Sequence, residues 1–224
     1  MIYRNTFTTE HTEITEKIRK IDPVNPLPDI IREAADVIKK GGIVLFPTRC
    51  LYGLGADAFN ADAVSRVFKI KQRPVNKPMS VLVKDRKAVE KLVQYVPPCA
   101  LQIMDSFWPG KVTIIFEAKA ALPVNLTAGT GKIGIRIPEH TVPSALANML
   151  DSPITGTSAN LSGSPGCSVV SDLEPLIADK LDLILDAGRL KGGAGSTVID
   201  VTGSAPKILR EGAVPAKDIF AVLS

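Results

Sequence analysis

Cysteine and histidine are scarce in this 224-residue chain, and their scarcity argues against several classes of site. The three cysteines, Cys50, Cys99 and Cys167, show no CxxC spacing. This disfavours a disulfide framework or a zinc site and indicates a reducing, cytoplasmic compartment. The two histidines, His11 and His140, offer little to a Ser-His-Asp triad or a histidine metal site. We therefore expect no metal held by protein side chains.

Long apolar runs and aromatic residues are also few. No stretch reaches the roughly 18 apolar residues of a membrane span, and residues 1–20 lack the apolar core of a signal peptide. Aromatic residues make up 5% of the chain, which disfavours a protein that stacks single-stranded RNA bases. The net charge of +4 is mild, so it is compatible with an anionic small substrate, with transient RNA contact or with neither.

The apolar pattern predicts one folded α/β domain with a twisted mixed β-sheet. With 45% apolar and 22% charged residues, the chain can bury a core, which excludes a disordered chain. Residues 1–22 are polar and are expected to form an extension ahead of a domain over residues 23–224. Helices are expected over 30–40 (capped by Asp29), 61–71, 88–96, 100–107, 143–150 and 216–222. Strands are expected over 43–46, 80–83, 112–116, 133–137, 154–157, 181–185, 197–201 and 207–210, with a long turn over 47–60.

Two glycine-rich segments come close to nucleotide-binding motifs without satisfying them. Residues 53–58 follow G-x-G-x-x-A, but no acidic residue stands at the required distance, so a tight glycine turn is the better interpretation. Residues 129–132, Gly-Thr-Gly-Lys, lack the first glycine and the hydroxyl of a P-loop. A turn whose amides face an anion remains open at Lys132.

A cluster of cations lies at the end of the predicted helix over 61–71. Two prolines restrict the chain just beyond it and would hold Arg73 and Lys77 in place. An arginine fork beside a lysine suits a polyphosphate. Cations at a helix C-terminus are equally favourable through the helix dipole alone. The residues themselves leave these two interpretations equally open.

Small polar side chains gather at the ends of predicted strands. Ser158 and Asn160 follow a buried strand, Ser196 stands before another, and Arg210 ends a third. Ligands of α/β sheets bind at the carboxyl ends of strands, so Ser158 and Asn160 are candidate hydrogen-bonding groups.

Five ordered motifs together resemble the YrdC/TsaC family. They are Pro-Thr-x-x-x-Tyr-Gly-Leu at 47–54, Lys-x-Arg-Pro-x-x-Lys-Pro at 71–78, Ser-Ala-Asn-x-Ser-Gly at 158–163, Ser-Thr-Val-Ile-Asp at 196–200 and Arg-Glu-Gly at 210–212. The resemblance covers nearly the whole chain from residue 23. It implies a YrdC-like fold with a wide basic concave face, in the family's short, single-domain form.

The resemblance implies a nucleotidyltransferase that makes L-threonylcarbamoyladenylate from L-threonine, bicarbonate and ATP and releases pyrophosphate. Mg²⁺ would accompany the ATP, and threonylcarbamoyl transferase proteins that modify tRNA would use the product. Two alternatives stay open: an RNA-binding or ribosome-associated module, and a paralogue acting on another carbamoyl compound.

The motifs also imply which residues form the pocket. ATP would be bound by Arg73, Lys77, Lys132, Ser158, Asn160, Gly166 and Arg210. Threonine would be bound by Cys50, Arg136, Gly156 and Ser196. Thr48 and Lys71 would lie between the two substrates, and Lys71 and Arg73 would be catalytic. The chain departs from the family pattern where an acidic residue and a hydroxyl are replaced by Arg49 and Cys50, which predicts altered threonine binding.

Overall fold

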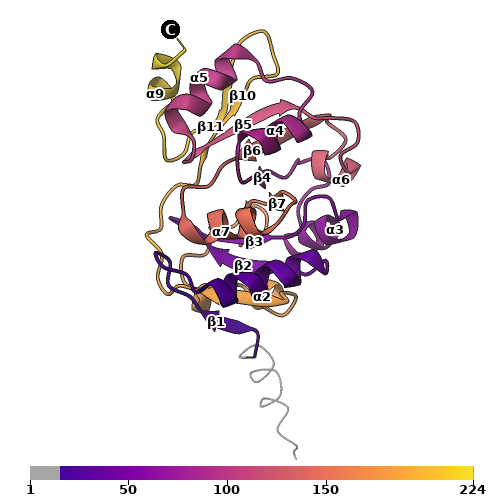
Figure 1. Ribbon diagram of the computed structural model, residues 1–224, viewed down its shortest axis with the longest axis vertical. Helices are drawn as coiled ribbons and strands as arrows, with labels where there is room; N and C mark the ends of the chain where they lie inside the picture. Colours follow the sequence, from indigo (N-terminus) through magenta and orange to yellow (C-terminus); the bar gives the residue numbers. More distant parts are fainter. Residues whose placement is uncertain (1–15, 224) are drawn as a thin grey trace, which may run out of the picture.

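The computed structural model describes residues 16–223 and contains two mixed β-sheets. The strands are β1 (Ile18–Lys20), β2 (Val44–Pro47), β3 (Tyr52–Gly55), β4 (Val81–Leu82), β5 (Val112–Glu117), β6 (Lys132–Arg136), β7 (Ile154–Thr155), β8 (Thr157–Ser158), β9 (Leu183–Asp186), β10 (Thr197–Asp200) and β11 (Lys207–Arg210). One sheet has the order β1-β9-β2-β3-β8 and the other β11-β10-β5-β6-β4-β7. Figure 1 shows them one above the other along the long axis of the molecule.

The helices cover the outer faces of both sheets. They are α2 (Pro28–Lys39), α3 (Ala61–Ile70), α4 (Arg86–Leu92), α5 (Pro98–Phe107), α6 (Val124–Thr127), α7 (Thr141–Met149), α8 (Pro175–Ala178) and α9 (Ala216–Ala221), with a 3-10 turn at Val170–Asp172. In α3, Val64 and Val67 are buried, and the Asn60 side chain accepts hydrogen bonds from the first-turn amides. The α/β class with mixed sheets is confirmed, although the strands divide into two sheets rather than one.

The two sheets diverge at Gly156. Thr155 ends β7 in one sheet, and Thr157 begins β8 in the other. A Cβ on Gly156 would stand 2.9 Å from the Leu82 side chain, so glycine lets the chain cross closely here. The single strand expected over 154–157 is therefore two short strands.

Strand β3 was expected to be part of a turn, and this prediction is wrong. Tyr52–Gly55 pairs antiparallel with β2 although two of its four residues are glycine. The Phe46 ring lies against both glycines. A Cβ would stand 3.2 Å from the ring at Gly53 and 2.8 Å from it at Gly55. The glycines thus admit an aromatic ring, which offsets their low strand propensity.

Two details at the N-terminal side also differ from expectation. Residues 18–20, assigned to a polar extension, form β1, which pairs parallel with β9. Residues 1–15 of that extension lie outside the described part of the chain. Asp29 does not cap α2; the helix begins at Pro28 with Leu27 in the capping position. Within residues 16–223, no helix is both long enough and apolar enough to cross a membrane.

Candidate functional site

A cavity of about 470 Å³ opens between the two sheets. Its size is within the range of small-molecule binding sites. Nine of the residues predicted for the pocket line it: Thr48, Cys50, Arg73, Lys132, Arg136, Gly156, Ser158, Ser196 and Arg210. They come from β6, β8, β11 and the loops between elements, so the topology gathers residues that are far apart in the sequence.

Three arginines of the wall are held by main-chain carbonyl groups. Arg73 follows α3 and donates to the carbonyl oxygens of Lys77 (3.0 Å) and Pro78 (2.6 Å). Arg136 ends β6 and donates to Gly110 (3.3 Å). Arg210 ends β11 and donates to the carbonyl oxygen of Ser196 (2.7 Å). Carbonyl groups orient these guanidinium groups without neutralising them.

The three arginines concentrate positive charge in the cavity. Burial lowers the pKa of each guanidinium, to about 10 for Arg136. The positive charge of Arg210 lowers the pKa of Arg73 further. At Arg136 the negative charge of Glu139 raises the pKa and the positive charge of Arg210 lowers it. All three arginines stay charged at neutral pH, and Arg210 repels the other two. An anionic ligand would relieve this repulsion.

The carboxylates of the wall are already paired. Asp200 forms an ion pair with Lys132 (3.0 Å) and accepts hydrogen bonds from Thr202. Glu139 lies 3.8 Å from the Arg49 guanidinium. Among residues 16–223, Arg73, Arg136 and Arg210 form no salt bridge. No group of three or more His, Cys, Asp or Glu side chains suited to a metal ion occurs in that part of the chain either.

Lys71, predicted to be catalytic, is not among the residues that line the cavity. Its side chain is 2% exposed. The Nζ donates to the carbonyl oxygens of Ser158 and Asn160 and to Asn160 Oδ1. Burial, and then the charge of Arg73, lower its pKa to about 8. In this structure the Lys71 side chain therefore bonds the segment that carries Ser158.

Three further predicted residues lie outside the wall. Asn160 donates to the carbonyl oxygens of Leu161 and Ser164 and accepts from Ser158, so its amide shapes the loop. The Lys77 side chain is exposed, and its main chain holds Arg73. Gly166 packs on Leu51, where a Cβ would stand 2.6 Å from a methyl group.

Sequence reasoning missed several residues of the wall, including Tyr52, Lys111, Thr113, Glu139 and His140. Thr113 Oγ1 lies 2.8 Å from Ser196 Oγ and joins β5 to the residue before β10. His140 caps α7, with Nδ1 accepting from the amide of Val142 (3.3 Å). The proximity of Glu139 and His140 to Arg136 in the sequence could have suggested them.

Comparisons with known proteins agree with this arrangement. The Sua5/YciO/YrdC family model, described as "Telomere recombination", matches residues 36–212. The chain is 34% identical to a threonylcarbamoyl-AMP synthase of Pyrococcus abyssi over 86% of its length and 36% identical to one of Bacillus subtilis over 94%. It spans 57% and 60% of those two relatives.

A solved structure is also similar. The crystal structure of P. abyssi Sua5 complexed with L-threonine aligns with a TM-score of 0.85 at 32% identity. The alignment covers 92% of this chain and 60% of that one. The family model alone matches well over half of the described residues, and the two-sheet fold agrees with it. The chain belongs to the Sua5/YciO/YrdC family.

Proposed function

We propose that this protein makes L-threonylcarbamoyladenylate from L-threonine, bicarbonate and ATP, and releases pyrophosphate. The observation that carries the proposal is the set of three arginines in one cavity, none of which forms a salt bridge within residues 16–223. A polyphosphate and an amino-acid carboxylate are anions of the kind that such a cavity takes. The names of the P. abyssi and B. subtilis relatives support the same activity.

The residues of the wall suit the chemistry of this reaction. Arg73, between α3 and β4, and Arg210, at the end of β11, would bind the phosphates, and Arg136 would bind the threonine carboxylate. The threonine amine forms a bond to the carbon of bicarbonate, and water leaves to give a carbamate. A carbamate oxygen then forms a bond to the α-phosphorus while the bond from that phosphorus to the pyrophosphate oxygen breaks. Such a step depends on positioning and charge stabilisation and needs no covalent nucleophile.

Magnesium would enter with the nucleotide. Mg²⁺ is commonly held by phosphate oxygens and water with few protein ligands. The donor set fits this mode, since both carboxylates of the wall are already in ion pairs and no protein cage is needed. When bound, Mg²⁺ would neutralise part of the phosphate charge.

The proposed product indicates which proteins would use it. Threonylcarbamoyl transferase proteins that modify tRNA would consume an activated threonylcarbamoyl group, and we place this step in the cytoplasm. The basic residues around the cavity would support transient RNA contact. An RNA-binding module without chemistry is the alternative, and the assay below separates the two.

The test is pyrophosphate release by the purified protein with ATP and Mg²⁺. We expect release only when threonine and bicarbonate are both present, with an adenylate of the expected mass. Parallel reactions replace threonine with serine, and threonine plus bicarbonate with carbamoyl phosphate. Release with carbamoyl phosphate alone would favour the paralogue, and no release in any mixture would overturn the proposed activity.

A further inference from the structure

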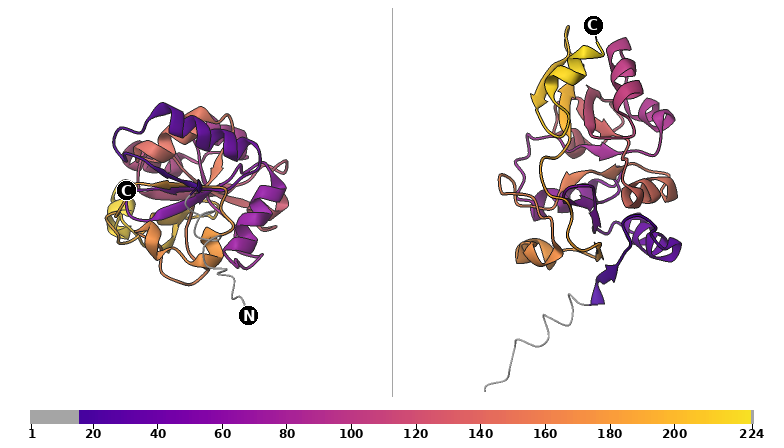
Figure 2. Two further views of the ribbon diagram at one scale, coloured as in Figure 1. Left: turned by 90° about the horizontal axis from the view of Figure 1, so that it is seen from below. Right: turned by 90° about the vertical axis from the view of Figure 1, so that its left-hand side faces the viewer.

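The connection between β9 and β10, residues 187–196, runs from one sheet to the other and is here called the strap. In the right-hand view of Figure 2 it is the orange segment that rises along one side of the molecule. Its last three residues, 194–196, line the cavity. The strap therefore connects the lower sheet to the wall that carries Ser196.

Three glycines of the strap face open space. Gly188, Gly192 and Gly193 have φ of 74°, 72° and 94°, and a Cβ on any of them would meet nothing within 4 Å. Two hydrogen bonds hold its middle: Leu190 donates to the Ser168 carbonyl (2.8 Å) and Gly192 to the Cys50 carbonyl (3.0 Å). The Leu190 side chain also packs, half-buried, against the core. A segment held by these few contacts takes its position largely from its anchors.

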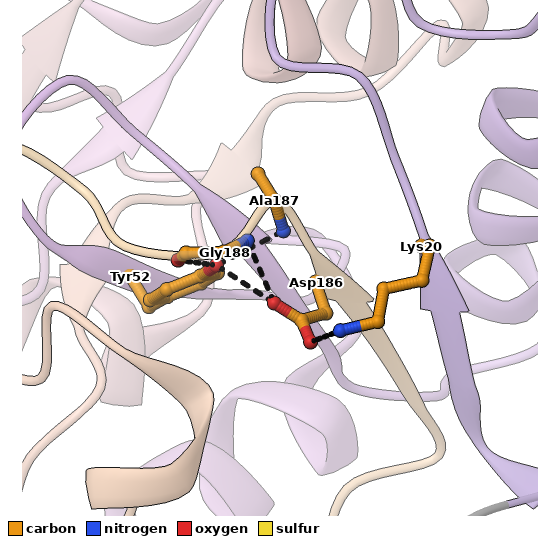
Figure 3. A network of polar contacts seen from close by, with 5 residues as sticks. All are labelled: Lys20, Tyr52, Asp186, Ala187 and Gly188. Carbon is orange, nitrogen blue, oxygen red and sulfur yellow. Dashed lines mark hydrogen bonds and ion pairs between the residues drawn. The ribbon is translucent and has the colours of Figure 1, made fainter.

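The first anchor is the buried hydroxyl of Tyr52. It accepts a hydrogen bond from the Ala187 amide (3.0 Å) and donates to the Gly188 carbonyl (2.7 Å), as Figure 3 shows. Asp186 Oδ1 lies 3.3 Å from the same hydroxyl and accepts from the Gly188 amide (2.8 Å). The first turn of the strap is thus bonded through both its amides and one carbonyl.

Asp186 ties this anchor to the N-terminal strand. Lys20 of β1 forms an ion pair with its other carboxylate oxygen (Figure 3). Burial raises the pKa of Asp186, but the hydrogen bonds from Lys20 and Gly188 outweigh burial and hold the pKa below its usual range. The carboxylate stays ionised and keeps accepting at neutral pH.

Tyr52 also joins two other segments close to the cavity. Its amide donates to the Cys167 carbonyl (2.8 Å), and its carbonyl accepts from Ala159 (2.9 Å), next to Ser158. One buried residue therefore bonds the strap at its hydroxyl and the 159 and 167 segments at its main chain. Because the main-chain bonds do not depend on the hydroxyl, its contribution can be removed separately.

We propose that Tyr52 is a positioning residue whose hydroxyl sets the first turn of the strap, so that Gly192 meets Cys50 at the cavity wall. The expected effect on threonine rests on the proposed function, since Cys50 belongs to the proposed threonine side. Loss of the hydroxyl leaves the ring and the main-chain bonds in place and frees the strap.

The test compares Tyr52→Phe with Tyr95→Phe, a matched change at an exposed tyrosine. Hydrogen exchange should become about tenfold faster at the Leu190 and Gly192 amides in Tyr52→Phe, with the strands of both sheets unchanged. The threonine KM should rise about three- to tenfold, as for one lost hydrogen bond, while the ATP KM stays within about twofold. Tyr95→Phe should match the wild type in every measurement.

The outcomes separate the two proposals. Unchanged exchange in the strap overturns the positioning role, and so does an equal rise in the KM of both substrates. If the protein releases no pyrophosphate, the proposed function fails, and the exchange measurement alone still decides the role of Tyr52. If Tyr52→Phe does not fold, Asp186→Ala, which removes the acceptor of the Gly188 amide, must speed exchange at the same two amides or the proposal falls.

Discussion

The Nζ of Lys71 lies 2.7 Å from the carbonyl oxygen of Asn160, with its ammonium group directed at the loop behind the cavity. Two further acceptors, the Ser158 carbonyl and Asn160 Oδ1, occupy its remaining hydrogens. A buried ammonium group with three acceptors and no carboxylate holds the loop only while it is charged. The loop therefore depends on the protonation of one lysine.

Activity should fall as the pH rises through about 8, the pKa of Lys71. The neutral amine has two hydrogens for three acceptors, so the Ser158 segment loosens. Stability should move the other way. The unfolded state binds more protons between pH 8 and the ordinary value of 10.5, so this group raises the free energy of unfolding as pH increases there. The pH profile of kcat/KM and denaturant unfolding across this range check both.

The control for this prediction is Lys69→Met, at an exposed site in the last turn of α3, just before Lys71. It should keep the alkaline decline in activity. The free energy of unfolding should be measured for the wild type and for Lys71→Met. The wild-type value minus the Lys71→Met value should increase over the same pH range. A decrease would contradict the assignment to Lys71.

Arg73→Ala should cost about 2–4 kcal/mol of transition-state stabilisation, as for other preorganised donors. The reason is that its guanidinium faces the cavity beside Arg210 with no carboxylate partner. Arg73→Lys keeps the charge but loses the fork, and should recover only part of the activity. Arg32→Ala, at an exposed arginine on α2, is the control for loss of an arginine. Parallel losses of melting temperature and activity would instead indicate a purely structural role at the helix end.

Cys50→Thr should lower the threonine KM by a few-fold to about tenfold, since a hydroxyl donates and accepts hydrogen bonds better than a thiol. Cys50 lines the cavity, whereas Cys99 does not and Cys167 is buried with its thiol donating to the Val169 carbonyl. A thiol reagent should inhibit the wild type, and threonine with ATP should protect it.

Cys99→Ser should remain sensitive to the same reagent. An unchanged threonine KM in Cys50→Thr, together with no protection by substrates, would identify Cys50 as an inert filler of the wall.

Gly212→Ala should reduce activity far more than its effect on folding would predict. A Cβ at this position would stand 2.4 Å from the Gly195 carbonyl oxygen and 2.6 Å from the Ser196 main chain. Relief of that clash separates the turn after β11 from Ser196 and withdraws Arg210 from its carbonyl partner. Steady-state kinetics with a melting curve measure the two effects. Gly203→Ala, whose Cβ would have its nearest neighbour at 3.7 Å, should match wild type.

Local patterns predicted most helices and strands of this fold. Residues 61–71 show apolar residues at helical spacing after Asn60, and α3 spans Ala61–Ile70. Strand β3 was missed because its two glycines are explained only by the Phe46 ring packed on them. The division of 154–157 between two sheets was missed because it depends on a close approach to Leu82.

Only part of the site was predicted, because some of its geometry also depends on contacts between distant residues. Motifs identified Arg73 and Arg210 as pocket residues, and both line the cavity. Whether a side chain faces ligand or supports the wall depends on acceptors elsewhere in the chain. Lys71 illustrates this, because its partners near residue 160 turn it away from the cavity. The contacts of Arg73 and Arg210 with substrates stay a prediction.

Strand β1 pairs with β9, and β5 pairs with β10, so the cavity can form only late in folding. A ribosome makes β1, β2 and β5 long before their parallel partners, and Arg210 emerges later still. Both sheets must wait for these distant strands, which makes assembly slow and non-local. A nascent chain that has not reached β10 therefore holds neither Ser196 nor Arg210. If the proposed function holds, nucleotide cannot stabilise such an unfinished chain, and its folding depends on packing alone.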